Sequence, residues 1–75
     1  MATLDDKRFL RQIGFRIRER RTALAMTLAE KCRLHRTFIG SCERGERNLA
    51  ILSLRRIARA LRIPEADLLR DPPHE

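Results

Sequence analysis

The amino-acid sequence predicts a small all-α domain. Apolar residues recur at three- and four-residue intervals along several segments, which is the period of an amphipathic helix. Residues that favour helix starts and helix ends stand between those segments. No segment alternates between apolar and polar residues as a half-buried strand does. Five short helices are therefore expected.

The first helix is expected to begin near Asp5 and Asp6, because acidic groups are favourable at the positive end of a helix. Its buried stripe would contain Leu10, Ile13 and Ile17. The segment Thr27-Leu-Ala-Glu30 fits a capping box, so a short second helix could run from Thr27 to Cys32.

The third helix is expected over residues 35–44, with Gly45 as its left-handed terminator. The fourth helix has a face of arginines opposite an apolar stripe, and that stripe contains Ile51, Leu54, Ile57, Ala58 and Leu61. Pro64 favours the start of a fifth helix, which Asp71 and two prolines end.

The 75 residues are enough for one domain, with a core over about residues 8–70 and a tail over 71–75. A chain of this length buries a modest core and often gains stability by dimerising. Charged residues make up 36% of the sequence, and no apolar run approaches the ~20 residues of a membrane span. Since the N-terminus also lacks a signal pattern, we expect a cytoplasmic protein without a membrane partner.

The formal net charge is +7, and only Lys7 and Lys31 among the 17 basic residues are lysine. Arginine forms bidentate hydrogen bonds to phosphate and to guanine, which lysine cannot do. A genome rich in G and C would also favour arginine codons. In either case the charge predicts a strong, salt-sensitive attraction to polyanions.

The sequence predicts neither an enzyme nor a metal site. Its two histidines, His35 and His74, belong to no Ser-His-Asp set or HExxH motif, and no glycine-rich phosphate loop is present. Cys32 and Cys42 occupy apolar positions, which indicates core packing, and no fourth zinc ligand stands at a usual spacing. No cofactor and no small-molecule ligand is therefore expected.

Residues 35–48 carry the clearest functional signal. They predict a short helix that opens with small polar and basic side chains, buries Ile39 and Cys42, ends at Gly45, and then presents Arg47 and Asn48 in a loop. A helix whose first turn offers guanidinium and hydroxyl groups is suited to the major groove of DNA. The chain is therefore predicted to bind double-stranded DNA.

Several motifs together resemble the Cro/C1-type helix-turn-helix family, also called the Xre family. They are Leu28-Ala-Glu-Lys31, Arg36-Thr-Phe-Ile39, Glu43-Arg-Gly45, Arg47-Asn48 and Ile57-Ala-Arg-Ala-Leu61. The opening of the third helix is particularly similar to controller proteins of restriction-modification systems. The resemblance covers about Arg16 to Leu69. It implies five helices and a homodimer, joined largely through its C-terminal helices, on a two-fold related operator.

Carried over by position, the resemblance implies that Arg36, Thr37 and Phe38 reach base edges and the adjacent backbone. Phe38 stands where the family often has tyrosine, so it keeps an apolar contact and lacks a hydroxyl. Glu43 is expected to hold a neighbouring arginine, and His35 to replace a capping serine near the DNA. The full set of expected DNA-binding residues is Thr27, His35, Arg36, Thr37, Phe38, Ser41, Arg44, Arg47, Asn48 and Ser53. Within it, Ser41 and Arg44 would touch base edges or phosphates, and Arg47, Asn48 and Ser53 would hold the phosphate backbone.

The sequence departs from the family at five places. The connection between the first two helices is about three residues short, and the glutamine that commonly contacts phosphate is missing. Arg33 and Arg62 stand where glycine is common, at about 1 kcal/mol each if the left-handed backbone persists. Ala50 replaces the usual Ser/Thr cap of the fourth helix, also at about 1 kcal/mol.

The short connection leaves two structures open. No Gly or Pro stands between Gly14 and Gly40, so the first and second helices could fuse and two chains could exchange segments. An ordinary turn near Thr22 or Thr27 also fits.

The predicted function is a homodimeric transcription regulator, a repressor or an activator. The alternatives are a variant with impaired DNA binding, and an antitoxin-like protein-interaction module that meets its partner through Pro64 to Leu69.

Overall fold

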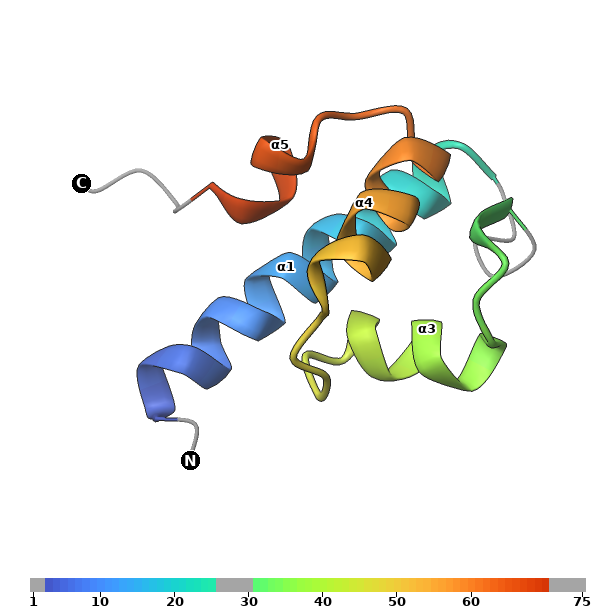
Figure 1. Cartoon of the computed structure of the whole chain (residues 1–75). Helices are drawn as coiled ribbons and strands as arrows, with labels where there is room; N and C mark the ends of the chain where they lie inside the picture. The colour runs from blue at the N-terminus through green and yellow to red at the C-terminus, as the bar shows by residue number, and fades with distance from the viewer. Residues whose placement is uncertain (1–2, 26–30, 71–75) are drawn as a thin grey trace.

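The computed structural model describes residues 3–25 and 31–70. These residues form the helices α1 (Leu4–Ala23), α3 (Arg36–Glu43), α4 (Ile51–Ala60) and α5 (Glu65–Leu69), and they contain no strand (Figure 1). The all-α prediction is confirmed for this part of the chain. Within it, no helix is long and apolar enough to cross a membrane.

Most of the predicted second helix lies outside the described residues, and so does the capping box predicted at Thr27 and Glu30. Only its last two residues, Lys31 and Cys32, are described, and both are helical. The expected count of five helices is therefore not confirmed.

The helix α1 begins one residue before the predicted acidic pair. Thr3 is its N-cap, and the Asp6 N–H donates to the Thr3 hydroxyl at 3.1 Å. The Asp6 carboxylate accepts from the Thr3 N–H at 3.0 Å, which completes a capping box that the sequence analysis did not anticipate.

The helix α1 ends at Ala23, so the structure does not contain the fused helix considered above. The N–H of Ala25 donates to the Thr22 carbonyl at 3.0 Å, and Ala25 adopts a φ of +50°. The chain therefore turns near Thr22, as the alternative prediction held. Because α3 packs on α1 of its own chain, the segment exchange that a fused helix would have caused is not confirmed either.

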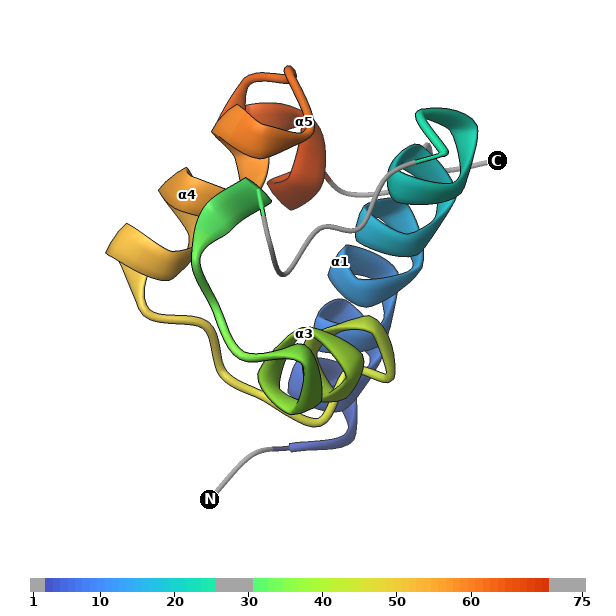
Figure 2. The ribbon, with the colours of Figure 1, turned by 90° about the vertical axis from the view of Figure 1, so that its right-hand side faces the viewer.

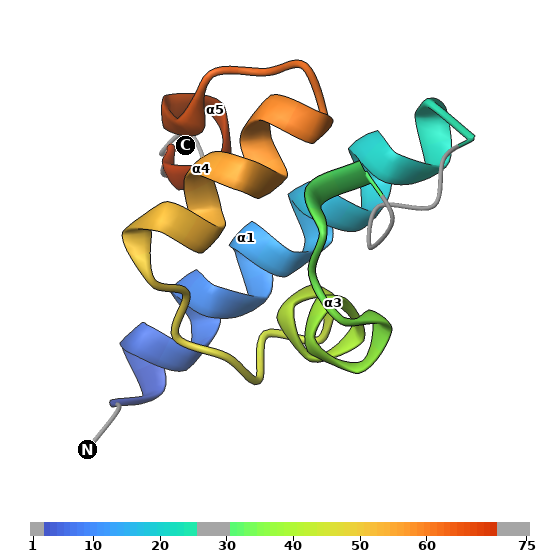
Figure 3. The ribbon, with the colours of Figure 1, turned by 45° about the vertical axis from the view of Figure 1, so that its right-hand side comes forward.

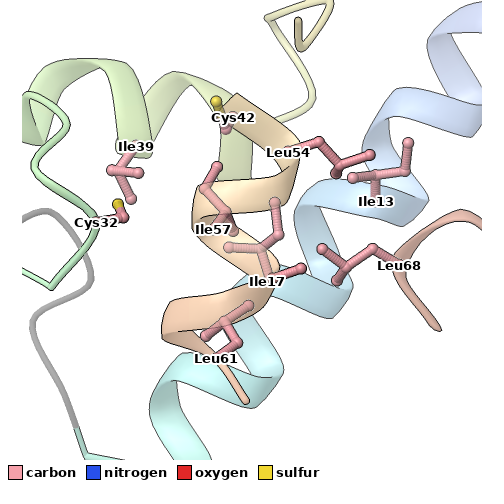
Figure 4. Packing of buried hydrophobic residues seen from close by; sticks show 10 residues of the cluster. Ile13, Ile17, Cys32, Ile39, Cys42, Leu54, Ile57, Leu61 and Leu68 are labelled. Atoms are coloured by element: carbon pink, nitrogen blue, oxygen red, sulfur yellow. The ribbon is translucent and has the colours of Figure 1, made fainter. Parts of the chain in front are cut away.

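The core lies where α1, α3, α4 and α5 meet (Figures 1 and 3). Figure 4 shows Ile17 of α1, Ile57 of α4 and Leu68 of α5 pointing toward one another. All three are fully buried, as is Leu61 just after α4. The predicted apolar stripes are confirmed in their central positions. The prediction was wrong for Ile51, which is 80% exposed at the first position of α4 and does not belong to the buried stripe.

Two glycines allow α3 to approach α1 closely. A Cβ atom added to Gly14 of α1 would lie 2.4 Å from the carbonyl oxygen of Cys42 in α3. A Cβ atom added to Gly45, just after α3, would lie 2.7 Å from the Cα of Arg11. Gly45 has a φ of +75° and is the left-handed terminator that the sequence predicted. The orientation of α3 on the scaffold thus depends on both glycines.

Two arginines adopt the left-handed backbone predicted for them, with a φ of +58° at Arg33 and +61° at Arg62. Arg62 follows α4, where the N–H of Ile63 donates to the Ala58 carbonyl at 3.1 Å in a Schellman-type ending. At the other end of α4, Ala50 is the N-cap and supplies no side-chain hydrogen bond, as predicted. The fourth helix is therefore strained at one end and uncapped at the other.

Candidate DNA-binding surface

The first turn of α3 begins at an N-cap histidine. His35 has an extended backbone, and its Nδ1 accepts a hydrogen bond from the Thr37 N–H at 3.1 Å. This satisfies one of the N–H groups that a helix start leaves without an intrahelical partner. The capping role predicted for His35 is therefore confirmed.

Arg36 and Thr37 are the exposed side chains of this first turn. Among the described residues, no hydrogen bond or ion pair engages either side chain. A guanidinium and a hydroxyl are thus presented to solvent at the start of a helix, where base edges in a major groove could accept or donate hydrogen bonds.

Phe38 and Arg47 form a contact between α3 and the loop that follows it. The ring of Phe38 is half-buried and packs against the core. The guanidinium carbon of Arg47 lies 5.7 Å from the centre of that ring, within the range of a cation–π interaction. Arg47 and its neighbour Asn48 are exposed. The Phe38 ring therefore holds the exposed Arg47 guanidinium beside α3.

Ser41 and Arg44 occupy different environments, although both were expected to touch DNA. Ser41 is only 7% exposed, and its hydroxyl donates to the Thr37 carbonyl at 3.0 Å. Arg44 is exposed, with its Nε donating to the Glu46 carboxylate at 3.1 Å and its Nη2 lying 3.5 Å from the Ser41 hydroxyl. Ser41 is thus a support inside the helix, while Arg44 faces solvent.

Glu43 holds an arginine, as predicted. Arg21 of α1 donates from Nε to Glu43 Oε2 at 2.5 Å and from Nη2 to Oε1 at 3.1 Å. The hydrogen bonds that Arg21 donates to the Glu43 carboxylate are the main reason that the pKa of Arg21 is raised. The pair fastens the C-terminal end of α3 to α1 and so helps to fix the orientation of α3 on the rest of the domain.

Ser53 and Thr27, the last two residues expected to bind DNA, do not belong to the first turn of α3. Ser53 is half-buried in the first turn of α4. Because Ala50 supplies no capping oxygen, the N–H groups of that turn have no side-chain partner and are available to an anion. Thr27 lies outside the described residues.

The sequence analysis assigned no role to three arginines of α1 that bind their own chain. Besides Arg21, Arg16 donates to the Leu68 carbonyl at 3.1 Å, and Arg20 donates to the Leu61 carbonyl at 3.0 Å. These contacts join α1 to the ends of α5 and α4. Gly14 was also missed, although a glycine inside a helical pattern is itself a signal of close packing.

A family model described as Helix-turn-helix matches residues 17–68. Among curated proteins, the chain is 45% identical over 42 residues to "Control protein C.BamHI" of Bacillus amyloliquefaciens. That alignment covers 56% of this chain and 52% of the relative, so the chain spans about half the length of the curated relative that it matches.

Solved structures are similar over more of the chain. The restriction-modification controller protein C.AhdI from Aeromonas hydrophila is 37% identical with a TM-score of 0.75, over 79% of this chain and 94% of that one. The hypothetical transcription factor NHTF from Neisseria is 30% identical with a TM-score of 0.77, over 96% and 87%. A tyrosine-to-phenylalanine variant of the controller protein C.Esp1396I is 35% identical with a TM-score of 0.73, over 91% and 85%.

None of these relatives is named as an enzyme. The family model covers more than half of the sequence, and the similar structures share the fold at 30% identity or more. The chain therefore belongs to the Cro/C1-type (Xre) helix-turn-helix family and is similar to restriction-modification controller proteins.

Proposed function

We propose that the chain is a transcription regulator of the controller type, which binds double-stranded DNA in a sequence-specific way as a homodimer on a two-fold related operator. The observation that carries the proposal is the exposed first turn of α3, where the side chains of Arg36 and Thr37 follow the N-cap His35 and face solvent. Its similarity to proteins named as controllers supports the regulatory role.

In this proposal two groups of side chains have different tasks. Arg36 and Thr37 read base edges, and Phe38 contacts a thymine methyl group or a sugar. Arg47 and Asn48 hold phosphates, with Arg47 oriented by the Phe38 ring. Phosphate contacts fix the register of the protein on the duplex, while base contacts select the sequence.

The remaining positions complete the contact with the backbone. Ser53 and the uncapped first turn of α4 bind a phosphate, and Arg44 reaches a phosphate or a base edge from the end of α3. His35 and Thr27 contact phosphates near the start of α3 and of the second helix. Ser41 acts indirectly, because its buried hydroxyl lies beside Arg44.

Exposed apolar side chains support the homodimer. Ile51 and Leu52 are exposed at the start of α4, and Leu69 is exposed at the end of α5. A hollow of about 580 Å³ lies between α1 and the C-terminal half of the chain, with Phe9 and Leu54 in its lining. A monomer of this size gains stability when a second copy covers such surfaces. Dimerisation through α4 and α5 would also set the spacing of the two recognition helices.

The dimer would repress by occluding a promoter or activate by recruiting polymerase, according to where its operator lies. Since DNA binding would require two chains, the protein concentration relative to the dimer dissociation constant would set the response.

Selection from a randomised duplex library, with excess non-specific competitor, tests the proposal. We expect recovery of a two-fold symmetric site whose half-sites are about one helical turn apart. A variant carrying Leu69→Glu, at the end of α5 and outside the proposed phosphate-binding turn of α4, should lose the two-fold site and sediment as a monomer. Recovery of nothing beyond salt-sensitive, sequence-blind binding by the unmodified chain would overturn the regulator proposal.

A further inference from the structure

Residues 31–33 lie beside α4 (Figure 2). A second hollow, with a volume of about 500 Å³, lies between these two segments. Its lining contains Lys31, Cys32, Arg33, Arg56, Arg59 and Ala60. None of the residues that we propose to touch DNA lines it, so this hollow is a separate surface of the domain.

The rim of the hollow is strongly basic. Its four charged residues are all cationic and all exposed, and no ion pair among the described residues reaches them. No described acidic residue lines the hollow. The sequence from Ile51 to Ile63 also contains no acidic residue, so α4 offers no carboxylate of its own to neutralise the rim. The site therefore favours an anionic partner.

The floor of the hollow is apolar. Cys32 is only 6% exposed, and Ala60 is half-buried. An apolar floor inside a charged rim is the arrangement of a protein-binding surface, where an apolar side chain is covered at the centre and polar groups pair around it. Duplex DNA is convex and presents phosphates and sugars at its surface, so it fits a recessed apolar floor less well than the side chain of an extended peptide does.

Arg33 stands on the rim of the hollow with a left-handed backbone. Its φ of +58° is a conformation that glycine adopts without strain and that costs arginine about 1 kcal/mol. The side chain kept at this cost lies on the rim of the hollow. Arg62 has the same backbone conformation outside the hollow, so the contribution of Arg33 to the site is its exposed cation and not its strain.

We propose that this hollow, the basic hollow of Lys31, Arg33, Arg56 and Arg59, binds an acidic peptide segment of a partner protein. An apolar side chain of that segment covers Cys32 and Ala60, and flanking carboxylates pair with the four cations. Arginine suits this task because its guanidinium holds a carboxylate with two parallel hydrogen bonds. The regulator would thus carry a protein-docking site in addition to its DNA-binding surface.

The test uses the full chain and a labelled synthetic peptide, Glu-Glu-Leu-Glu-Glu, with binding followed by fluorescence anisotropy. A peptide in which serine replaces leucine carries the same charge and should bind several-fold more weakly, because the floor loses its apolar contact. Equal binding of the two peptides would contradict docking on the floor.

Matched variants separate the hollow from the general charge of the protein. The double variant R56Q/R59Q should bind the leucine peptide roughly 5- to 20-fold more weakly, since each exposed ion pair contributes modestly. The variant R55Q/R62Q removes two arginines outside the hollow, one in α4 and one just after it, and should bind within about twofold of the unmodified chain. Equal losses in both variants would overturn the proposal, because attraction would then be non-specific.

Arg33→Gly distinguishes lost binding from lost folding. The substitution relieves the left-handed strain, so its melting temperature should rise while peptide affinity falls about two- to fivefold. A melting temperature that rises with unchanged peptide affinity would exclude Arg33 from the site.

A final measurement separates this proposal from the DNA-binding function. The peptide should still bind a chain saturated with a short duplex, and R36Q/R47Q should retain peptide affinity within about twofold. Displacement of the peptide by the duplex would identify the hollow as a second phosphate-binding surface and overturn peptide docking. Failure of the chain to bind any duplex would refute the regulator function and leave the peptide measurements unaffected.

Discussion

Arg21 near the end of α1 holds Glu43 at the end of α3 with two hydrogen bonds, from Nε at 2.5 Å and from Nη2 at 3.1 Å. The Glu43 side chain is mostly buried, so its carboxylate depends on this arginine for solvation. The pair is the polar counterpart of the glycine contact between the same two helices, where Gly14 of α1 meets the Cys42 carbonyl. Together they determine how the proposed recognition helix is presented.

Arg21→Ala should lower the free energy of unfolding by about 1–2 kcal/mol, because it leaves the Glu43 carboxylate partly buried without its partner. Urea denaturation followed by circular dichroism measures the change. Arg18→Ala on the exposed face of the same helix is the control and should stay within about 0.5 kcal/mol. Equal losses in the two variants would show that the ion pair contributes nothing beyond helix propensity.

Gly14→Ala should destabilise the fold by several times more than Gly40→Ala. The added Cβ at Gly14 would meet two backbone carbonyl oxygens of α3, at 2.4 and 2.5 Å, so the helices would have to separate. The added Cβ at Gly40 meets only the mobile end of Arg44 at 3.2 Å, and alanine favours a helix interior by up to about 1 kcal/mol. Thermal melts of both variants would decide, and similar melting temperatures would contradict the close approach of α1 and α3.

The fold and part of the site follow from local patterns in the sequence. The buried positions of Ile17 and Ile57 follow from helical spacing, and the cap at His35 follows from its place before a helix start. The exposure of Ile51 does not follow from spacing, because it depends on which element packs over the first turn of α4. The burial of Ser41 likewise depends on how α3 lies against the rest of the chain.

The roles of the first-helix arginines could not be predicted for a similar reason. Arg16 and Arg20 donate to the carbonyls of Leu68 and Leu61, which are more than forty residues away in the sequence. An arginine outside an apolar stripe looks solvated until the ends of other helices are placed beside it. Such long-range polar contacts depend on tertiary structure that helical periodicity does not specify.

Arg62→Gly should stabilise the chain by about 1 kcal/mol, because glycine adopts the φ of +61° without the steric penalty of a Cβ atom. Arg59→Gly makes the same chemical change inside α4 and should destabilise by about 1 kcal/mol, since glycine is unfavourable in a helix interior. Opposite shifts in the urea midpoint are expected. Shifts of the same sign would show that the two arginines act through charge rather than backbone conformation.

The stability of the fold should fall as the pH rises above 9. Burial raises the pKa of the Cys42 thiol from 9.0 to about 11, so the folded state keeps a proton that the unfolded state loses. The stabilisation is complete below pH 9 and disappears as the pH approaches 11. Urea unfolding across this range should show a slope that Cys42→Ala reduces, although Cys42→Ala also lowers stability at pH 7 by leaving a cavity. An unchanged slope would mean that the pKa of Cys42 does not differ between the folded and unfolded states.

Arg36 and Arg47 should differ in how their loss affects DNA binding. Arg36 has no described partner and stands on the first turn of α3, so Arg36→Ala should relax specificity at one base pair and cost about 1–3 kcal/mol on the selected operator. Arg47 is proposed to hold a phosphate, so Arg47→Ala should weaken all duplexes alike and reduce the salt slope of binding by about one. Titrations of the selected operator and of point-substituted operators at several salt concentrations would separate the two effects. If both variants lost the same affinity on every duplex, the division between base reading and phosphate contact would be wrong.

Phe38→Leu should affect DNA binding through both groups of contacts, because it removes the ring 5.7 Å from the Arg47 guanidinium while keeping an apolar side chain. It should therefore weaken binding to every duplex through the lost contact with Arg47, and the preferred base sequence should change at most at the thymine that the Phe38 ring is proposed to contact.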